Sequence, residues 1–429
     1  MSPQLGLVVK TTTNKKKLEL LKRVTNPLPM QYLGAKGRIA DWIISCVSKD
    51  LPNTNVFVDL FAGTGTVSLF AASYNYKIIA NDLQPYSSNI LDALFQYPRN
   101  NVNRIIKKVS LLSAEQLLLT NGRKYASKML TIEKKFFSSS KTKSFDWKSY
   151  KKFCDNTPLI SGIGKDVLKL RESNQYNLFI KYYSNTYFGI RQCLEIDAIK
   201  ELSDSLPKKD RVILSAATIS ALTYAVSSTT HLAQFLKPNS DKKSKSLIKR
   251  RSLSIIDMVI ERLCDLKKFQ ASKHNALITN YDFKHALTHI RKNKKTVVYV
   301  DPPYFKEHYS RYYHVLDTFL LYDYPLLTIN KQTKDVTIGR YREDRLVSDF
   351  GKRSTVKEAF HTLMKNCFEK SFSLAISYAD TSLVSKKEII MMAKKVGYKC
   401  KVDKKKLMHS GQGQPVNKEV SEFLFILSH

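Results

Sequence analysis

Three short apolar segments, far apart in the chain, constrain its fold more than any other feature of the sequence. They cover residues 55–60, 77–82 and 296–301. Each is rich in β-branched residues and has an acidic residue, Asp59, Asp82 or Asp301, at or near its end. Near-continuous apolar strands are typical of a parallel sheet covered on both faces, and acids at strand ends lie where such sheets bind ligands. The sequence therefore predicts an α/β fold with a doubly wound, mostly parallel sheet.

Two later segments add to this sheet, and a long middle section differs from it. Residues 373–378 resemble the buried strands, and residues 420–427 are expected to form an edge strand. The middle section is rich in Lys, Ser and aromatic residues at 123–153, apolar and helical in pattern at 212–236, and strongly basic in an expected loop at 237–251. We therefore predict a mainly helical domain, residues 96–274, inserted into a sheet domain formed by residues 1–95 and 275–429.

The net charge points to a polyanionic partner. The 429 residues include 71 Lys and Arg against 37 Asp and Glu, a net charge of +34 that is spread over much of the chain. A folded basic protein of this kind usually binds nucleic acid. The alternative is a solvated, lysine-rich surface that reflects codon bias in an AT-rich genome.

The cysteines and the apolar runs bear on location. None of the six cysteines forms a Cys-x-x-Cys pair, which favours free thiols in a reducing compartment over disulfides or a zinc site. There is no run of about 18 uncharged apolar residues, and the N-terminus lacks the apolar core of a secretory signal. We expect a cytoplasmic protein with no membrane span and no metal.

A glycine turn follows the first predicted strand. Gly63 and Gly65 lie between that strand and an expected helix, where missing side chains let a cofactor approach the backbone. Ser68 replaces the third glycine of a dinucleotide fingerprint, which weakens a nicotinamide interpretation. Asp59 could bind an ammonium group. Asp82, after the second strand, could bind ribose hydroxyls, although a turn or helix-capping aspartate is the alternative.

The most specific motif is Asp301-Pro302-Pro303-Tyr304. The prolines remove two N–H donors and fix the backbone, so that carbonyl oxygens and the Asp301 carboxylate can face a ligand as acceptors. An amine on an aromatic ring is a poor nucleophile, and two acceptors that hold its hydrogens direct its lone pair toward a methyl donor. Tyr304 supplies a face for stacking an extruded base.

These motifs, in this order, resemble those of the Dam-like, alpha-order N6-adenine DNA methyltransferases. Residues 31–36 resemble the family's Tyr-x-Gly-Gly-Lys element, with Ala35 in place of the second glycine, and residues 280–283 resemble its Asp-Phe element. The resemblance covers roughly residues 28–95 and 275–429. It implies a Rossmann-like sheet that binds S-adenosylmethionine. The cofactor residues that it implies are Tyr32, Gly34, Lys36, Asp59, Phe61, Ala62, Gly63, Gly65, Thr66, Asp82, Asp282, Phe283 and Asp301.

The family places DNA recognition in the middle section, which agrees with the basic composition found there. The resemblance implies duplex DNA as the partner, with the target adenine turned out of the helix, and a cognate restriction endonuclease as a functional partner. The candidate DNA-binding residues are Lys242, Lys243, Lys245, Lys249, Arg250, Arg251 and Arg311. Residues 339–342 are a further phosphate-contact candidate. The alternatives are methylation of RNA adenine or a protein amide, and an inactive DNA-binding relative.

Overall fold

The computed structural model describes residues 26–112, 126–160, 165–172, 175–228, 232–269, 276–303, 309–379, 383–410 and 417–429. Within these ranges a seven-stranded sheet has the order β3-β2-β1-β4-β5-β7-β6. Its strands are β1 (Val56–Asp59), β2 (Lys77–Asn81), β3 (Leu277–Thr279), β4 (Thr296–Val300), β5 (Ser373–Ala379), β6 (Lys399–Ser410) and β7 (Asn417–Ser428). The neighbouring strands β3, β2, β1, β4 and β5 pair in parallel, whereas β7 is antiparallel to both β5 and β6. This confirms the predicted α/β fold with a mostly parallel sheet.

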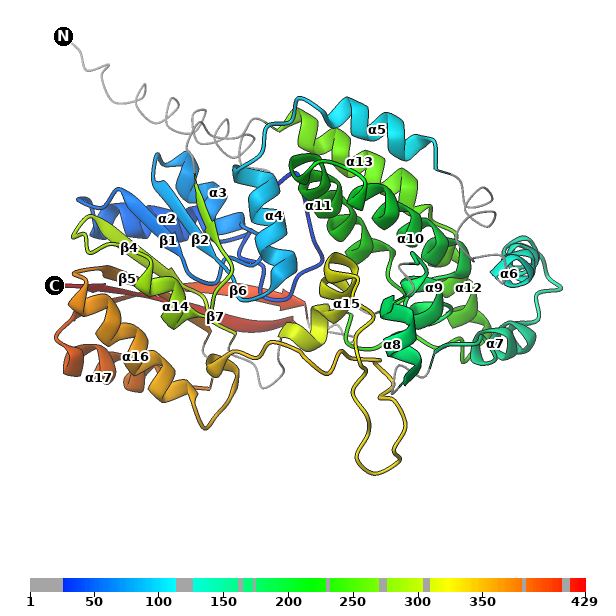
Figure 1. The fold of residues 1–429 in the computed structure, drawn as a ribbon. Coiled ribbons are helices and arrows are strands. Elements are labelled where there is room, and N and C mark those ends of the chain that lie inside the picture. The colour runs from blue at the N-terminus through cyan, green and yellow to red at the C-terminus, as the bar shows by residue number, and fades with distance from the viewer. Residues whose placement is uncertain are drawn as a thin grey trace, which may run out of the picture.

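Helices cover both faces of the sheet. Phe57 and Val297 point into a core with α2 and α3, whereas Val58 and Val298 point into a second core with α14, α16 and α17 (Figure 1). Successive side chains of a strand face opposite sides, so an apolar strand needs such a cover on each face. These helices are α2 (Ala40–Asp50), α3 (Thr66–Ser73), α14 (Phe283–Thr288), α16 (Val356–Glu369) and α17 (Lys386–Val396).

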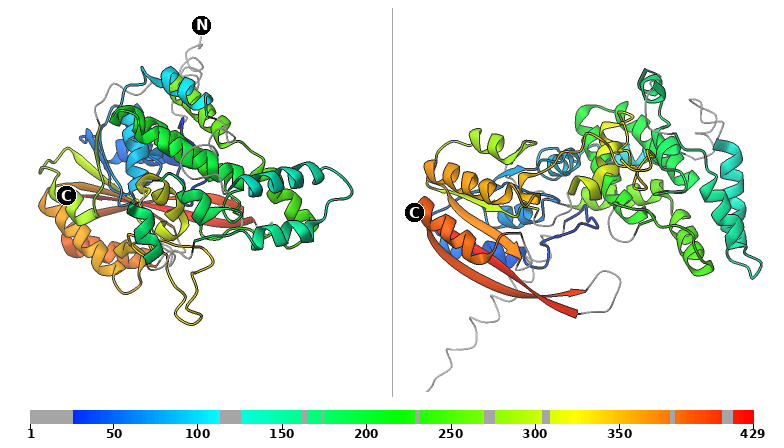
Figure 2. Two further views of the ribbon diagram at one scale, coloured as in Figure 1. Left: turned by 45° about the vertical axis from the view of Figure 1, so that its right-hand side comes forward. Right: turned by 90° about the horizontal axis from the view of Figure 1, so that it is seen from below.

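The remaining helices form a lobe beside the sheet rather than over one of its faces (Figure 2). They are α4 (Pro85–Phe95), α5 (Val102–Ser110), α6 (Ser127–Ser139), α7 (Trp147–Asp155), α8 (Lys165–Glu172), α9 (Leu178–Tyr183), α10 (Ile190–Asp204), α11 (Lys208–Ala225), α12 (Asp241–Arg251), α13 (Ile255–Lys268) and α15 (Tyr309–Leu321). A short 3-10 helix, η3 (Asp349–Gly351), precedes α16. None of the described helices is long and apolar enough to cross a bilayer.

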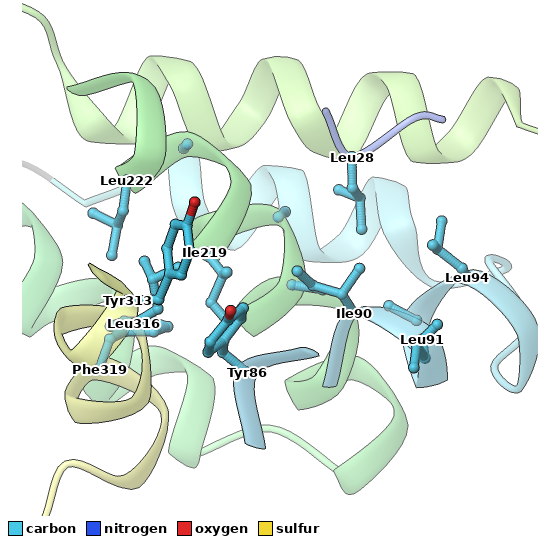
Figure 3. Packing of buried hydrophobic residues seen from close by; sticks show 14 of the residues in the cluster. Leu28, Tyr86, Ile90, Leu91, Leu94, Ile219, Leu222, Tyr313, Leu316 and Phe319 are labelled. Carbon is cyan, nitrogen blue, oxygen red and sulfur yellow. The ribbon is translucent and has the colours of Figure 1, made fainter. Parts of the chain in front are cut away.

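One continuous core joins the lobe to the sheet. Figure 3 shows Tyr86 and Ile90 of α4 packed toward Ile219 of α11 and Tyr313 of α15, and the same cluster includes Phe57 and Ile78 of the sheet. Helix α15 follows the Asp301 motif in the chain, and the carbonyl of its Leu320 accepts a hydrogen bond from the lobe. The helical lobe therefore also contains a segment that the predicted boundary at residue 274 leaves out.

Buried carboxylates on the sides of some helices of the lobe bind the N-termini of others. Glu133 of α6 accepts N–H groups from the first turn of α10. Within α10, Glu195 accepts an N–H from the start of α13, and Asp197 accepts two from the start of α9. Asp317 of α15 accepts an N–H from the start of α4. The first N–H groups of a helix lack partners within it, and its positive end favours a negative charge. Each carboxylate thereby fixes the start of one helix against the side of another.

Three expectations about local structure were wrong or incomplete. The segment at 420–427 lies in β7, which is paired on both sides, and the strand at this edge of the sheet is β6, which was not predicted. Strand β3 was also missed. Residues 241–251 form helix α12 rather than a loop, because the Ser240 hydroxyl accepts the Lys243 N–H at its start, while Leu247 and Ile248 are buried on one face.

Arg251, predicted to contact DNA, is fully buried, and that prediction is wrong. Its guanidinium donates to the Tyr150 hydroxyl at 2.9 Å, to the Asn185 carbonyl at 2.9 Å and to the Thr186 carbonyl at 3.1 Å. It also donates to the Cys154 thiol. A cation without solvent needs such a set of acceptors. Arg251 therefore joins α7, α12 and the chain before α10.

We expect Arg251→Met to lower the free energy of unfolding by about 3 kcal/mol or more, because five oxygens would lose a buried charged donor. The matched control is Lys249→Met on the exposed side of the same helix, with an expected change within about 0.5 kcal/mol. Urea denaturation followed by circular dichroism measures both. Equal unfolding midpoints for the two variants would contradict this role.

Candidate active site

A cavity of about 350 Å³ lies at the carboxyl ends of β1, β2 and β4. Its wall brings together the motifs that are far apart in sequence: the glycine turn, Asp82, Asp282, Asp301 and the segment around Lys36. Asp301 therefore borders the same cavity as the glycine turn. Strand β4 lies directly beside β1 in the sheet, which makes neighbours of residues separated by most of the helical lobe.

Asp82 fixes the conformation of the glycine turn. Gly63 and Gly65 have φ of +52° and +74°, a region that favours glycine. A Cβ at Gly65 would lie 2.8 Å from Leu91, so there is also no room for one. The Asp82 carboxylate accepts the Gly63 N–H and the Gln84 N–H, both at 2.8 Å. Asp82 thus has a structural role in the turn, and its contact with a ribose stays a prediction.

Asp59 presents an unsatisfied oxygen to the cavity. Its side chain is 1% exposed, and its Oδ2 accepts the Ser68 hydroxyl at 2.6 Å, whereas its Oδ1 has no hydrogen-bond partner among the described residues. Burial raises the pKa of Asp59 to about 7; the hydrogen bond from Ser68 opposes this shift, and the nearby charge of Asp301 adds to it. A buried acceptor without a partner is costly, and a cationic ligand group would satisfy it.

Asp301 is held by a buried lysine. Lys36 Nζ lies 2.9 Å from Asp301 Oδ1 and 3.4 Å from Glu422 Oε1, and Ser377 donates to the same Glu422 oxygen at 2.6 Å. Burial would lower the pKa of Lys36, but the charges of Asp301 and Glu422 outweigh it and raise that pKa. The lysine therefore stays charged and fixes one oxygen of Asp301 toward itself. Pro302 is buried, and Pro303 lines the cavity.

Two tyrosines of α15 position the segment that carries Lys36. The Tyr313 hydroxyl accepts the Leu33 N–H at 2.7 Å, and Tyr309 donates to the Leu33 carbonyl at 3.0 Å. Gly34 has φ of +75°, and a Cβ there would lie 2.8 Å from the Tyr309 hydroxyl. Ala35, the departure from the family pattern, has no positive φ and is accommodated.

Aromatic residues close the opposite end of the cavity. Phe61 and Phe283 both pack edge-on against Phe350, with ring centroids 5.2 and 5.1 Å apart. Asp282 caps α14 by accepting the N–H groups of Lys284 and His285. Lys284 in turn lies 3.5 Å from Asp349, which places an ion pair at this border of the cavity.

Most predicted cofactor residues line this cavity. Those that do are Tyr32, Gly34, Lys36, Asp59, Phe61, Ala62, Gly63, Thr66, Asp82, Asp282, Phe283 and Asp301. Gly65 does not line it and acts through the shape of the turn. Tyr304 lies outside the described residues. Among the described residues, no group of three or more His, Cys, Asp or Glu side chains is arranged to hold a metal ion.

The predicted DNA-binding residues lie elsewhere. Lys242, Lys243, Lys245 and Lys249 are exposed on α12, which packs against α6 and α7 at the end of the lobe away from the sheet (Figure 1). Arg250 is half-buried and donates to backbone carbonyls. Arg311, on α15, stacks over a tyrosine ring at 5.2 Å.

Comparison with known families decides the relationship. The model of the D12 class N6 adenine-specific DNA methyltransferases matches residues 32–341, well over half of the chain. The chain belongs to this family. The match includes the glycine turn, Asp82 and Asp301, and confirms the resemblance inferred from those motifs.

Individual relatives of this methyltransferase have low sequence identity to it but align with most of its chain. It is 23% identical over 399 residues to the type II methyltransferase M.CviAII of Paramecium bursaria Chlorella virus 1. The aligned region covers 92% of this chain and 97% of the relative. It is 26% identical over 304 residues to M.NlaIII of Neisseria lactamica, covering 68% and 70%. The modification methylase StsI of Streptococcus sanguinis is 22% identical over 416 residues, but the chain spans only 52% of its length.

Several residues of the methyltransferase site were not predicted from the sequence. Glu422 and Ser377 complete the Lys36 cluster, and Tyr309 and Tyr313 position Lys36. A charged residue directly before the apolar run at 423–427 was the sequence signal for Glu422. Its partners, Lys36 before α2 and Ser377 in β5, are far away in the chain, and pairing of that kind cannot be deduced from spacing.

We expect Lys36→Met to lower the melting temperature more at pH 8 than at pH 5, because it leaves two poorly solvated carboxylates without their cation, and acid neutralises carboxylates. Differential scanning calorimetry at both pH values measures the effect. The control Lys36→Met/Glu422→Gln removes one of the carboxylates and should recover part of the loss at pH 8. An equal loss at both pH values would contradict the ion-pair role.

Proposed function

We propose that this methyltransferase moves the methyl group of S-adenosylmethionine to N6 of adenine within a specific sequence of duplex DNA. The observation that carries the proposal is the place of Asp301, which borders the same cavity as the glycine turn and Asp59. A carboxylate acceptor for an amine and a carboxylate acceptor for a cationic cofactor thereby face one space.

The residues present fit the cofactor. The free Oδ1 of Asp59 suits the ammonium group of its methionine part, and the glycine turn leaves space where side chains would block approach. Tyr32 borders the turn, and Phe283 with Asp282 would meet the adenine ring at the aromatic end. When bound, S-adenosylmethionine supplies an electrophilic methyl group on a sulfonium.

Asp301 would orient the adenine amine. With Lys36 orienting the carboxylate through Oδ1, Asp301 and the Pro302 carbonyl would serve as the acceptors for the two amine hydrogens. Two fixed acceptors direct the nitrogen lone pair, which is delocalised in the free base, toward the methyl group. Asp301 can also take the proton that the nitrogen loses. Tyr304 would stack on a base that has left the duplex.

The basic lobe would hold the DNA. Lys242, Lys243, Lys245 and Lys249 are suited to phosphate contacts, which supply affinity but no sequence information. We further propose that the enzyme acts beside a restriction endonuclease of the same specificity, since the named relatives include type II methyltransferases and modification methylases. Such an enzyme would work in the cytoplasm, in contact with the genome.

The competing functions are methylation of adenine in RNA, methylation of a protein amide, and DNA binding without methyl transfer. Radiolabelled methyl transfer to duplex DNA, transfer RNA and bulk protein separates them. We expect label on DNA alone, with N6-methyladenine as the modified base. Label on RNA or protein, or cofactor binding without any transfer, would reject the proposal.

Asp301→Asn is expected to lower the rate of methyl transfer by about 10²- to 10³-fold, because an amide can present a donor where the amine needs an acceptor. Affinity for S-adenosylmethionine, measured by calorimetry, should stay near the wild-type value, since Asp59 and the glycine turn are unchanged. Single-turnover assays give the rate. A wild-type rate in this variant would remove Asp301 from the chemistry.

Cofactor affinity should fall as the pH is lowered from 7.5 to 5.5, by roughly tenfold or more. With a pKa raised to about 7 in the free protein, Asp59 is mostly ionised at the upper pH and mostly protonated at the lower, whereas the cofactor ammonium stays charged. Binding must therefore displace a proton at low pH. Calorimetry in buffers of different ionisation enthalpy measures that proton. Asp59→Asn should bind weakly with a flatter pH dependence, and an unaltered slope would contradict the assignment.

A further inference from the structure

A two-stranded ribbon leaves the helical lobe between α15 and η3. Bridges pair Leu327 with Arg342 and Ile329 with Val336 in antiparallel fashion. Figure 1 shows this ribbon projecting from the body of the protein below α15. It follows the Asp301 motif in the chain and therefore lies outside the segment at 96–274 in which DNA recognition was predicted.

The base of the ribbon is rigid. Arg342 is 3% exposed, and its guanidinium binds Asp323 at 2.7 and 2.8 Å and Asp344 at 2.9 and 3.1 Å. Tyr341 donates to the Ala233 carbonyl at 2.6 Å. Residues 339–342, a phosphate-contact candidate in the sequence, thus serve to anchor the ribbon, and that prediction is wrong for Arg342.

The turn at the tip is shaped by its own polar groups. Asn330 N–H donates to the Asp335 carbonyl at 2.8 Å, and the Asn330 side-chain oxygen accepts the Gln332 N–H at 2.9 Å. Lys334 has φ of +61°. With the backbone fixed in this way, Lys331, Gln332 and Lys334 are exposed side chains on a defined turn.

Apolar residues are also concentrated on this exposed segment. Of the 13 large hydrophobic residues that are exposed in the described chain, five lie between 326 and 347: Leu326, Ile329, Ile338, Leu346 and Val347. Exposed apolar groups gathered in one place mark an interaction surface. The last two also line the cavity, so the segment connects the ribbon directly to the site of methyl transfer.

We propose that this ribbon enters the major groove of DNA and that Lys331, Gln332 and Lys334 read base edges beside the target adenine. The major groove admits a two-stranded ribbon, lysine pairs with guanine, glutamine pairs with adenine, and apolar side chains contact thymine methyl groups. The net charge of +34 supplies the attraction to DNA. The inference rests on the proposed function and assigns sequence reading to the ribbon, leaving phosphate affinity to α12.

The test compares ribbon variants with α12 variants. Lys331→Ala, Gln332→Ala and Lys334→Ala are each bound to the cognate duplex, found by modified-base sequencing of DNA methylated by the wild type, and to a scrambled duplex. We expect each ribbon variant to lose about 5- to 150-fold of its preference for the cognate duplex, with scrambled binding little changed for Gln332→Ala. Cofactor affinity and melting temperature should match the wild type, because the three side chains are exposed.

The matched control is the triple variant Lys242→Ala/Lys243→Ala/Lys249→Ala on α12. It should weaken binding to both duplexes by the same factor and reduce the salt dependence of that binding. Lys107→Ala/Lys108→Ala on α5 controls for loss of charge at a remote site. Ribbon variants that methylate the same sequence with unaltered preference would overturn the inference while the proposed function stands. A wild-type protein that leaves DNA unmethylated would reject the proposed function first, and the inference with it.

Discussion

The contact on which the site depends is the buried ion pair between Lys36 and Asp301. An unpaired charge in that position would favour its neutral form, so the carboxylate that we propose to act in methyl transfer is kept ionised by a cation with little access to water. Glu422 gives that cation a second partner, and the tyrosines of α15 hold the segment on which it sits. The acceptor is therefore oriented before a substrate arrives, which is the arrangement that electrostatic catalysis requires.

Two kinds of carboxylate serve the structure in different ways. Those in the helical lobe, such as Glu133 and Asp197, have their oxygens directed at helix N-termini and fix one helix against another. Asp59, which lines the cavity, has one oxygen without a hydrogen-bond partner in the part of the chain that the structure describes. Satisfied acids stabilise the scaffold, whereas an unsatisfied one marks where a ligand belongs.

Sequence alone predicted the parallel strands β1, β2 and β4, the glycine turn and the place of Asp301 at the end of β4, because each depends on local residue types. Strand β3, three residues long, lacks enough pattern to be recognised, and β6 carries alternate lysines at a sheet edge that resemble a solvated loop. Arg251 was misassigned for the opposite reason. The lysines of the same helix face solvent, and only the packing of α12 shows that the Arg251 side chain points inward.

The antiparallel strand β7 has a consequence for synthesis of the protein. It brings Glu422 into contact with Lys36, although Lys36 is made early and Glu422 long after Asp301. Until β7 joins the sheet, Lys36 lacks one of the two carboxylates that it binds in the folded protein. We therefore expect a nascent chain to reach full activity only after that last strand has been translated and paired.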